Sequence, residues 1–502
     1  MKLRLLAVPF LVALIAAATE PTPETRRWWS HVQALANDGL EGRDTGSEGY
    51  RKASRYVAAQ FDRLGLRPAG DNGFFQSVPM HSVRLSVERS SVELAEKDGV
   101  RKLNWLRQIT VAANARLPEA IDAPLAFVGN AMYANELDVK GKILVELNAP
   151  LVEGAQRVVA TAPAGAAGLL GIDSPLGPEP ARWPVSYAVA VSLASTPATA
   201  VANPTPVLRF NPKFADLLFK GTGHTYKELL DLAAQGKPVP NFPLKSTLRA
   251  RLRFESADIA SDNVLAVLPG SDPVLASQYV AISAHLDGYG IGEPVKGDRI
   301  YNGAFDDAAY VATLIDFAER LHESNTKLRR SLLFVVVTGE EKGLLGSKFF
   351  TEHPTIFKEG SAKENIVANV NLDQLRPLFP LKLLTVVALD ESTLGDTVKQ
   401  VAESMDIRIQ KDPEPARHLL RRSDHWNFMQ IGVPAVGFIF GYEKGSPEEA
   451  IYRDWYANRY HKPADDLDQP WDPAAAAKFN EFFGRLVQVV ANADSRPKWN
   501  TR

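Results

Sequence analysis

Histidines and carboxylates occur along the chain in the combination that a hydrolase with two metal ions requires. They are His285 and Asp287 in SAHLDGYG, Asp306 in NGAFDDAA, Glu340 and Glu341 in TGEEKGLLGS, Asp373 in NVNLDQL, and His461 in RYHKPADD. Two imidazoles and three carboxylates are enough to hold two divalent cations, and one glutamate is left over to move a proton. The combination predicts a zinc-dependent hydrolase.

The adjacent pair Glu340 and Glu341 is the most informative of these candidates. The two glutamates follow the apolar run LLFVVV, where burying two carboxylates without cations is costly. A solvated helix start is the alternative. We expect one glutamate to bind metal and the other to take a proton from the attacking water and deliver it to the leaving amine.

The other candidates are weaker when each is taken singly. A metal-bound histidine usually donates its second ring N–H to a carboxylate, and Asp287 stands two residues after His285 in a suitable place for that role. Asp306 and Asp307 are adjacent, so only one of them is expected to face the metals. We expect Asp306 to be the ligand and Asp307 to cap the helix that follows, because Asp is a preferred N-cap.

Residues 254–495 contain the elements that must position these side chains. Apolar runs alternate there with amphipathic segments, which is the pattern of an α/β sheet covered by helices on both faces. Ligands in such sheets come from the carboxyl ends of strands, where His285, Glu340 and Asp373 are expected. Asp373 is the only carboxylate in IVANVNLDQL and needs a partner if buried. His461 has no such context, so a surface histidine is the alternative there.

The rest of the chain divides into segments that differ in composition and in the spacing of their apolar residues. Residues 24–75 place apolar residues at helical spacing, and residues 76–110 alternate as strands do. Residues 111–253 contain short apolar runs separated by Pro, Gly and Ala, which indicates a separate β-rich domain. The predicted division is 1–18 signal peptide, 19–110 N-terminal part of the catalytic domain, 111–253 inserted domain, 254–495 main part of the catalytic domain, and 496–502 C-terminal tail.

Composition limits the classes of partner. Lys and Arg number 57 against 59 Asp and Glu, a net charge of −2, so there is no overall basic field for nucleic acid. MKLR followed by the apolar run Leu5 to Ala18 is typical of a secretory signal peptide, so we expect export to the periplasm or the medium. The run is short for a bilayer span, although an uncleaved anchor is the alternative. Without cysteine, any zinc must be held by N and O ligands.

Six motifs resemble those of the M28 family of co-catalytic zinc aminopeptidases. They are AHLDGYG, NGAFDDAA, TGEEKGLLGSKFF, NLDQ, SDHWNFMQIGVPAV and YHKPADDLD, and LEGRDTGSEGYRKASRYVAAQFDRLGLRPAGDNGFFQ near the N-terminus also resembles the family. DVKGKILVEL and AGAAGLLGI resemble, more loosely, the protease-associated (PA) domain that some members carry as an insertion. The resemblance implies an α/β fold whose mixed, mostly parallel sheet lies between helices, with an inserted β-rich PA-like domain over 111–253.

The resemblance also implies a site with two Zn2+ per chain and one shared carboxylate. One zinc would be held by His285, Asp306 and Asp373, and the other by Asp306, Glu341 and His461, with Glu340 as the general base. Tyr460 matches a tyrosine that in some members donates a hydrogen bond to the tetrahedral oxyanion, and a packed aromatic is the alternative. Asp465 is expected to orient His461.

Two departures from the family pattern surround the predicted ligands. DDAAY at Asp306 to Tyr310 replaces the usual D-N-A-S-G, and Gln374 to Arg376 replace an apolar residue and a glycine after Asp373. Neither departure removes a predicted ligand. Arg376 could bind a substrate carboxylate in the cleft or pair with a surface acid.

The expected function is an exported aminopeptidase that hydrolyses the N-terminal residues of peptides. The acids of the cleft favour a cationic amine, whereas Arg376, Arg421 and Arg422 favour a carboxylate, so a carboxypeptidase or dipeptidase is the alternative. A glutaminyl cyclase with one zinc is disfavoured because all five ligand positions are filled. A non-catalytic binding protein on this scaffold would lack ligands or the Glu340 position. Side-chain preference and oligomeric state do not follow from the sequence.

Overall fold

The computed structural model describes residues 20–129, 138–148, 164–176, 181–197, 205–357 and 361–500. The signal peptide predicted at 1–18 therefore lies outside the described residues, as do the last two residues of the tail predicted at 496–502. Within the described ranges, no helix combines the length and the apolar character needed to cross a membrane.

Eleven α-helices lie in the described ranges, and their capping residues explain where several of them begin. They are α1 (Pro23–Ala36), α2 (Glu48–Arg63), α3 (Asp216–Phe219), α4 (Tyr226–Ala234), α5 (Ala309–Glu323), α6 (Leu345–Glu352), α7 (Ala362–Asn365), α8 (Leu394–Glu403), α9 (His425–Gln430), α10 (Pro447–Asn458) and α11 (Pro473–Asn492). Ser446 and Asp472 cap α10 and α11, and each is followed by a proline at the first helical position. Ser47 caps α2 by accepting the N–H of Tyr50.

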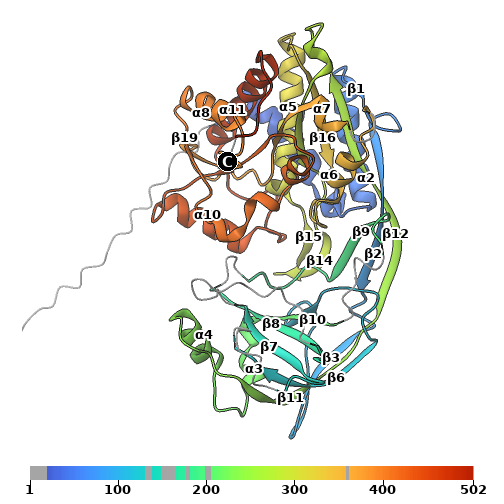
Figure 1. Cartoon of the computed structure of the whole chain (residues 1–502), viewed down its shortest axis with the longest axis vertical. Helices are drawn as coiled ribbons and strands as arrows, with labels where there is room; N and C mark the ends of the chain where they lie inside the picture. Colours follow the sequence, from blue (N-terminus) through green and yellow to red (C-terminus); the bar gives the residue numbers. More distant parts are fainter. Residues whose placement is uncertain are drawn as a thin grey trace, which may run out of the picture.

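A large mixed sheet forms the upper part of the molecule in Figure 1. Its strands, in sheet order, are β19 (Arg408–Gln410), β18 (Leu383–Val387), β20 (Ala435–Phe440), β17 (Ile366–Asn371), β13 (Tyr279–His285), β16 (Ser331–Val337), β12 (Phe254–Leu268), β2 (Phe75–Leu85) and β9 (Val189–Leu193), and β1 (Arg67–Pro68) pairs with β12. The central strands β20, β17, β13 and β16 are parallel, whereas β12, β2 and β9 pair antiparallel at one side. The expected α/β class is confirmed, and the parallel pairing is concentrated at the centre of the sheet.

Helices cover both faces of this sheet, which explains why its central strands are apolar throughout. Successive side chains of a strand point to opposite faces. In β16, Phe334 lies in the core shared with α1, α2, α5 and α11, and its neighbour Val335 lies in the core shared with α6, α7 and α9. All seven residues of β16 are buried. The run LLFVVV therefore has no solvent face on which a polar residue could be placed.

A second sheet forms the lower part of the molecule and has its own core (Figure 1). In sheet order its strands are β4 (Gly99–Lys102), β3 (Ser91–Glu96), β11 (Phe242–Arg251), β6 (Ala120–Phe127), β7 (Ile143–Asn148), β8 (Gly168–Asp173), β10 (Val207–Phe210) and β5 (Ile109–Val111). Strands β3, β4 and β5 thus belong to this sheet, although the sequence division placed 19–110 in the catalytic domain. The reason is that Val92, Leu94 and Leu103 are buried in the second core. The assignment of 111–253 to a PA-like domain stays a prediction.

Two long antiparallel strands connect the two parts. β2 and β12 pair continuously from Phe75↔Val264, in the upper sheet, to Leu85↔Phe254, near the lower one. They run along one side of the molecule in Figure 1. The hairpin of β14 (Gly290–Val295) and β15 (Asp298–Tyr301), which follows β13 in the chain, lies between the two parts.

Candidate metal centre

Parallel strand order brings three of the predicted residues to one edge of the large sheet. β17, β13 and β16 are neighbours and parallel, so their carboxyl ends lie together. His285 is the last residue of β13, and the loops that follow β16 and β17 carry Glu340 and Asp373. Ligand sites of open α/β sheets form at this edge.

Asp306 and His461 reach the same place from outside the sheet. Asp306 lies in η5 (Ala304–Ala308), the irregular turn that leads into α5, and His461 lies in the loop after α10. The turn depends on Gly303, whose φ is 61°; a Cβ there would lie 2.4 Å from the main-chain oxygen of Asp306. Only glycine fits both requirements, so the Gly303 position helps to fix Asp306.

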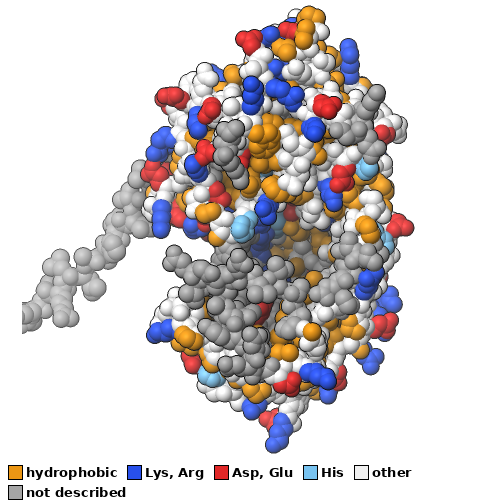
Figure 2. Space-filling view, viewed as in Figure 1, with side chains coloured by type: hydrophobic (Ala, Val, Ile, Leu, Met, Phe, Trp, Pro, Cys, Tyr) orange, Lys and Arg blue, Asp and Glu red, His pale blue; other side chains and the backbone are white. Residues whose placement is uncertain are grey.

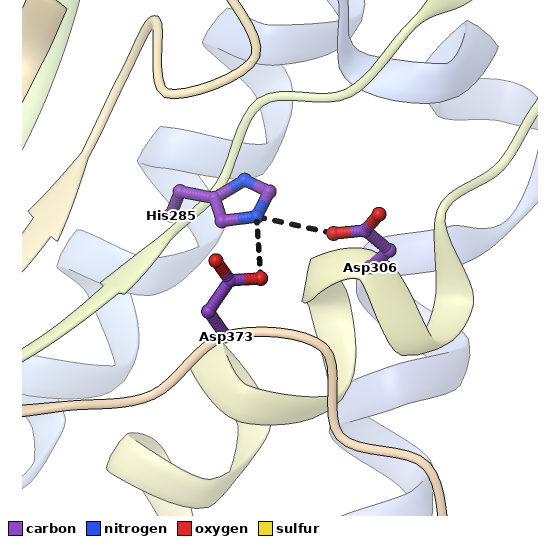
Figure 3. A group of neighbouring side chains, drawn as sticks. All are labelled: His285, Asp306 and Asp373. Carbon is purple, nitrogen blue, oxygen red and sulfur yellow. Dashed lines mark ion pairs between the residues drawn. The ribbon is translucent and has the colours of Figure 1, made fainter. Parts of the chain in front are cut away.

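The side chains of His285, Asp306 and Asp373 converge on one point (Figure 3). His285 Nε2 lies 3.2 Å from Asp306 Oδ1 and 3.7 Å from Asp373 Oδ1. These spacings between donor atoms suit a single cation, because ligands about 2 Å from a zinc ion lie about 3–4 Å from one another.

A second group uses the other oxygen of the same aspartate. His461 Nε2 lies 3.1 Å from Asp306 Oδ2 and 3.2 Å from Glu341 Oε1. Asp306 therefore faces His285 with one oxygen and His461 with the other. The structure brings together all five residues that the sequence predicted as ligands, in two groups of three that share Asp306.

Four donor atoms of the two groups are buried and lack the hydrogen bonds that such atoms normally have. Among the described residues, none forms a hydrogen bond to His285 Nε2, Asp306 Oδ2, Glu341 Oε1 or Asp373 Oδ1. Buried polar atoms without partners are costly, and one metal ion in each group would supply partners for these atoms. Because the donors are imidazole and carboxylate groups, they fit zinc with N and O ligands.

Electrostatics at the site also favour cations. The buried carboxylates around the two groups include Asp287, Asp307, Glu340, Asp424 and Asp465. Burial raises the pKa of Glu340 well above its ordinary value, and the charges of Asp373 and Glu341 raise this pKa further, against the effect of His285. Burial alone would raise the pKa of Asp306 as well, but the close imidazoles of His285 and His461 hold it below its ordinary value. Negative charge is in excess at the site.

Asp287 is placed differently from the expectation. The Nδ1–H of His285 is donated to the main-chain oxygen of Asp287 at 3.0 Å, and the Asp287 carboxylate lies 3.9 Å away. That carboxylate instead accepts the main-chain N–H of Glu340 at 3.0 Å and the hydroxyl of Thr45 at 2.9 Å. Asp287 thus links the His285 segment to the glutamate loop and fixes the ring orientation of His285 through its backbone.

Asp465 and Asp307 also differ from the expectation. Asp465 does not orient His461; its two oxygens accept the main-chain N–H groups of Phe305 and Asp306 at 3.0 and 3.1 Å. Burial raises the pKa of Asp465 to about 7. Asp307 does not cap α5, whose N-cap is Ala308 without a side-chain hydrogen bond. Adjacency in sequence suggested both roles, but the turn at η5 directs these groups elsewhere.

Tyr460 and Tyr289 surround His461. The ring centroids of Tyr460 and His461 are 3.7 Å apart, and the Tyr460 hydroxyl accepts a hydrogen bond from Gln374 Nε2 at 2.7 Å. Tyr289 Oη lies 2.8 Å from His461 Nδ1, so this tyrosine orients the imidazole. Tyr289 stands in the AHLDGYG motif, but no role was predicted for it from the sequence.

Arg43 is a buried residue that sequence reasoning missed, although it stands in the LEGRD segment. Its guanidinium donates to the main-chain oxygens of Leu286 at 2.8 Å, Asn302 at 2.6 Å and Gly303 at 3.0 Å, and also to that of Leu35. It therefore ties the segment after His285 to the segment before Asp306. Burial lowers the pKa of Arg43 to about 10, so it remains charged at neutral pH.

The second part of the molecule also contributes side chains. Arg182 Nη1 lies 2.6 Å from His461 Nδ1. Tyr187 accepts a hydrogen bond at 2.5 Å from Lys342, the residue after Glu341, and Lys342 also lies 3.0 Å from Asp44. No motif marked these residues, because their place depends on how the two parts of the chain pack.

Arg376, which the sequence offered as a substrate-binding residue, is fully buried. Its guanidinium lies over the rings of Tyr452, Trp455 and Tyr456, at 4.4, 5.1 and 5.8 Å from their centroids. A side chain held in this way does not line the open cleft.

The comparisons with known proteins agree with this geometry. Residues 263–487 match peptidase family M28. Aminopeptidase Y of Saccharomyces cerevisiae is 25% identical over 222 residues, which are 43% of this chain and 36% of the yeast protein, so the chain spans about a third of that relative.

Two solved structures resemble the whole chain. The aminopeptidase from Aneurinibacillus sp. strain AM-1 superposes with a TM-score of 0.61 at 18% identity, covering 94% of this chain and 95% of its own. The zinc aminopeptidase BSAP from Bacillus subtilis superposes with a TM-score of 0.59 at 17% identity, covering 94% and 96%. At these identities the likeness shows a common fold. The motifs of the sequence, the fold and the match over residues 263–487 thus agree in their similarity to peptidase family M28.

Proposed function

We propose that the chain is an exported zinc aminopeptidase, in which two zinc ions and Glu340 act on the N-terminal peptide bond of a peptide. The observation that carries this proposal is the pair of three-residue groups that share Asp306, with the buried carboxyl of Glu340 beside them. The names of the yeast relative and of the two structural neighbours, all aminopeptidases, support the same activity.

Each group would hold one ion. His285, Asp306 and Asp373 would bind one zinc, and Asp306, Glu341 and His461 the other. Zinc bound there would supply Lewis acidity and would lower the pKa of a water molecule.

Glu340 is suited to carry the proton. Its pKa is raised by burial, and a carboxyl with a raised pKa exchanges protons more readily near neutral pH. The hydrogen bond from its main-chain N–H to Asp287 fixes the loop that carries it. Glu340 would accept the proton of the attacking water and pass it to the leaving amine.

Tyr460 is suited to stabilise the oxyanion. Because its oxygen accepts the hydrogen bond from Gln374, the hydroxyl hydrogen is available for donation to another acceptor. A donor aimed at the position where negative charge develops is worth about 10²–10³ in kcat in other hydrolases. Packing against His461 places this donor beside the group that contains Glu341.

The charge around the site favours the amino end of a peptide. Asp373, Asp424 and Glu340 lie near one another on the His285 side. Besides burial, the charges of Asp373 and Asp424 raise the pKa of Glu340, and the charge of Asp373 raises the pKa of Asp424. A cationic amine would be attracted to this side.

A set of blocked peptides tests the proposal. Zinc-loaded protein is expected to cleave Ala-Ala-Ala-Ala and its C-terminal amide at similar rates, and to leave N-acetyl-Ala-Ala-Ala-Ala intact. Cleavage of the acetylated peptide at an undiminished rate would show that the amino end is not recognised. Export is tested separately by sequencing the N-terminus of the protein from the producing cell, which is expected to begin near residue 19.

A further inference from the structure

Arginines gather on the side of the site that faces the second part of the molecule. Arg182 lies against His461, and its guanidinium stands 4.6 Å over the ring of Tyr460 and 5.8 Å over that of Tyr456. Figure 2 shows Lys and Arg side chains in the recess between the two parts. Stacking on two aromatic rings holds the plane of the guanidinium in a defined orientation.

Two more arginines lie over the ring of Tyr456. The guanidinium groups of Arg376 and Arg417 lie 5.8 and 4.4 Å from the centroid of the Tyr456 ring. Three permanent positive charges therefore surround the ring of Tyr456, which stacks on Tyr460, the neighbour of His461. Arg417 pairs with Glu414, whereas in the described ranges the guanidinium nitrogens of Arg376 have no hydrogen-bond partner.

A cavity of about 690 Å³ opens beside this cluster. It is lined by Arg417, Tyr452 and Tyr456 from one part of the molecule, and by Ala181, the neighbour of Arg182, from the other. A space of this size holds one or more amino-acid residues, and Tyr456, over which Arg182 stands, forms part of its wall.

The two sides of the site therefore differ in the charge of the side chains that gather there. Carboxylates gather on the side of His285, Asp373 and Asp424, and arginines gather on the side of His461. A substrate whose amine lies at the acidic side extends its next residue toward the arginines. A zwitterion with an amine and a carboxylate close together matches this distribution of charge.

We propose that Arg182 binds a carboxylate on the substrate residue that follows the scissile bond. The substrates best served would be dipeptides, through their α-carboxylate, or peptides with an acidic side chain at that position. The inference rests on the proposed function, because it assumes that the amine occupies the acidic side. Arginine suits the role, since its planar fork binds a carboxylate with two parallel hydrogen bonds.

The test compares matched pairs of short substrates that differ only in one carboxylate. Comparing Ala-Ala with Ala-Ala-NH₂ measures the effect of the α-carboxylate. Comparing Ala-Glu-NH₂ with Ala-Gln-NH₂ measures the effect of a side-chain carboxylate. In at least one pair, the wild-type protein is expected to cleave the substrate that carries the carboxylate with the higher kcat/KM. Arg182→Gln should lower that preference about 10- to 100-fold, the effect of losing a charge-assisted hydrogen bond.

Two further variants separate the effect of the planar guanidinium of Arg182 from the effect of its charge and from those of a surface arginine. Arg182→Lys keeps the charge without the planar fork and is expected to retain part of the preference. Arg249→Gln is the matched control, because Arg249 is a surface arginine of β11 that pairs with Asp122. It should leave the preference unchanged.

Equilibrium binding gives a readout that does not depend on turnover. Calorimetric titration of zinc-loaded Glu340→Gln protein should show tighter binding of Ala-Ala than of Ala-Ala-NH₂, or of Ala-Glu-NH₂ than of Ala-Gln-NH₂. The added Arg182→Gln change should remove that difference.

Three results would overturn the inference. They are equal wild-type kcat/KM within both pairs, an equal slowing of all four substrates by Arg182→Gln, and no difference in Kd in the titrations. An equal slowing would mean that Arg182 positions His461, which a fall in zinc content would also indicate. Rapid cleavage of N-acetyl-Ala-Ala would instead refute the aminopeptidase proposal, while the pairs still report on the carboxylate.

Discussion

Replacing Arg43 by methionine tests whether one buried side chain holds the metal-binding segments together. The guanidinium donates to four main-chain oxygens, including those of Leu286 and Gly303, which flank the segments carrying His285 and Asp306. Methionine fills most of the same volume but donates no hydrogen bond. The variant therefore leaves these oxygens without their donor, in a region shielded from water.

The magnitude follows from the number and type of these bonds. A hydrogen bond from a charged donor contributes about 1.5–3 kcal/mol, but four bonds that share one guanidinium do not add fully. Removing one partner of a buried charged interaction costs about 3–5 kcal/mol, and we expect Arg43→Met to lower the free energy of unfolding by about that amount. Zinc affinity should fall about 10- to 100-fold, the usual effect of losing a group that supports metal ligands.

Tryptophan fluorescence during urea unfolding of the zinc-free protein measures the effect. Trp29 stacks on Trp471 with ring centroids 4.5 Å apart and contacts Phe305, which precedes Asp306, so the signal reports on the affected region. Arg249→Met, on the surface of β11, is the control and should change stability by less than about 0.5 kcal/mol. A loss below about 1 kcal/mol for Arg43→Met, or an unchanged zinc affinity, would refute the reasoning.

Two further predictions concern the metal and pH. Glu340→Gln should keep about two zinc ions per chain by elemental analysis while kcat falls about 10²–10⁴-fold, whereas Glu341→Gln should lose one ion; near-normal turnover of Glu340→Gln would exclude it as the base. Burial lowers the pKa of His425 to about 4, below its unfolded value near 6.5. Between pH 4 and pH 6.5 the unfolded chain therefore binds a proton at His425 that the folded chain does not. The contribution of His425 to the free energy of unfolding is full above pH 6.5, and roughly 3 kcal/mol of it is lost by pH 4. The metal-free His425→Gln variant should therefore show a flatter pH dependence of its urea midpoint than metal-free wild type, and equal slopes would contradict this.

Much of the sheet and the ligand set followed from local patterns. Apolar runs buried on both sides indicated parallel strands, and parallel neighbours must end at one edge, so His285, Glu340 and Asp373 could be expected to meet. Asp306 was found through its motif. Each of these predictions used only a strand and the residues directly after it.

The remaining features depended on contacts between distant segments. Asp465 supports Asp306 rather than His461 because the turn at η5 presents its N–H groups to that carboxylate. Arg182 reaches His461 only because the second part of the molecule packs against α10 and the loop after it. Strands β3 to β5 joined the second sheet because their apolar residues fill its core, and alternation alone does not say which core a strand enters.

The paired strands β2 and β12, here called the β2–β12 ribbon, also set the spacing of the two parts of the molecule. Its eleven cross-strand pairs form a stiff connection between the two parts, instead of the soft linkers that usually join domains. β9 returns from the second part to pair with β2, which adds a third strand to this connection. Removing one cross-strand pair would shorten the ribbon by about 3.3 Å, more than a hydrogen bond can stretch. The length of the ribbon thus sets the distance between Arg182 and the metal ligands, and lengthening or shortening both strands together offers a way to adjust the size of the substrate that fits between them.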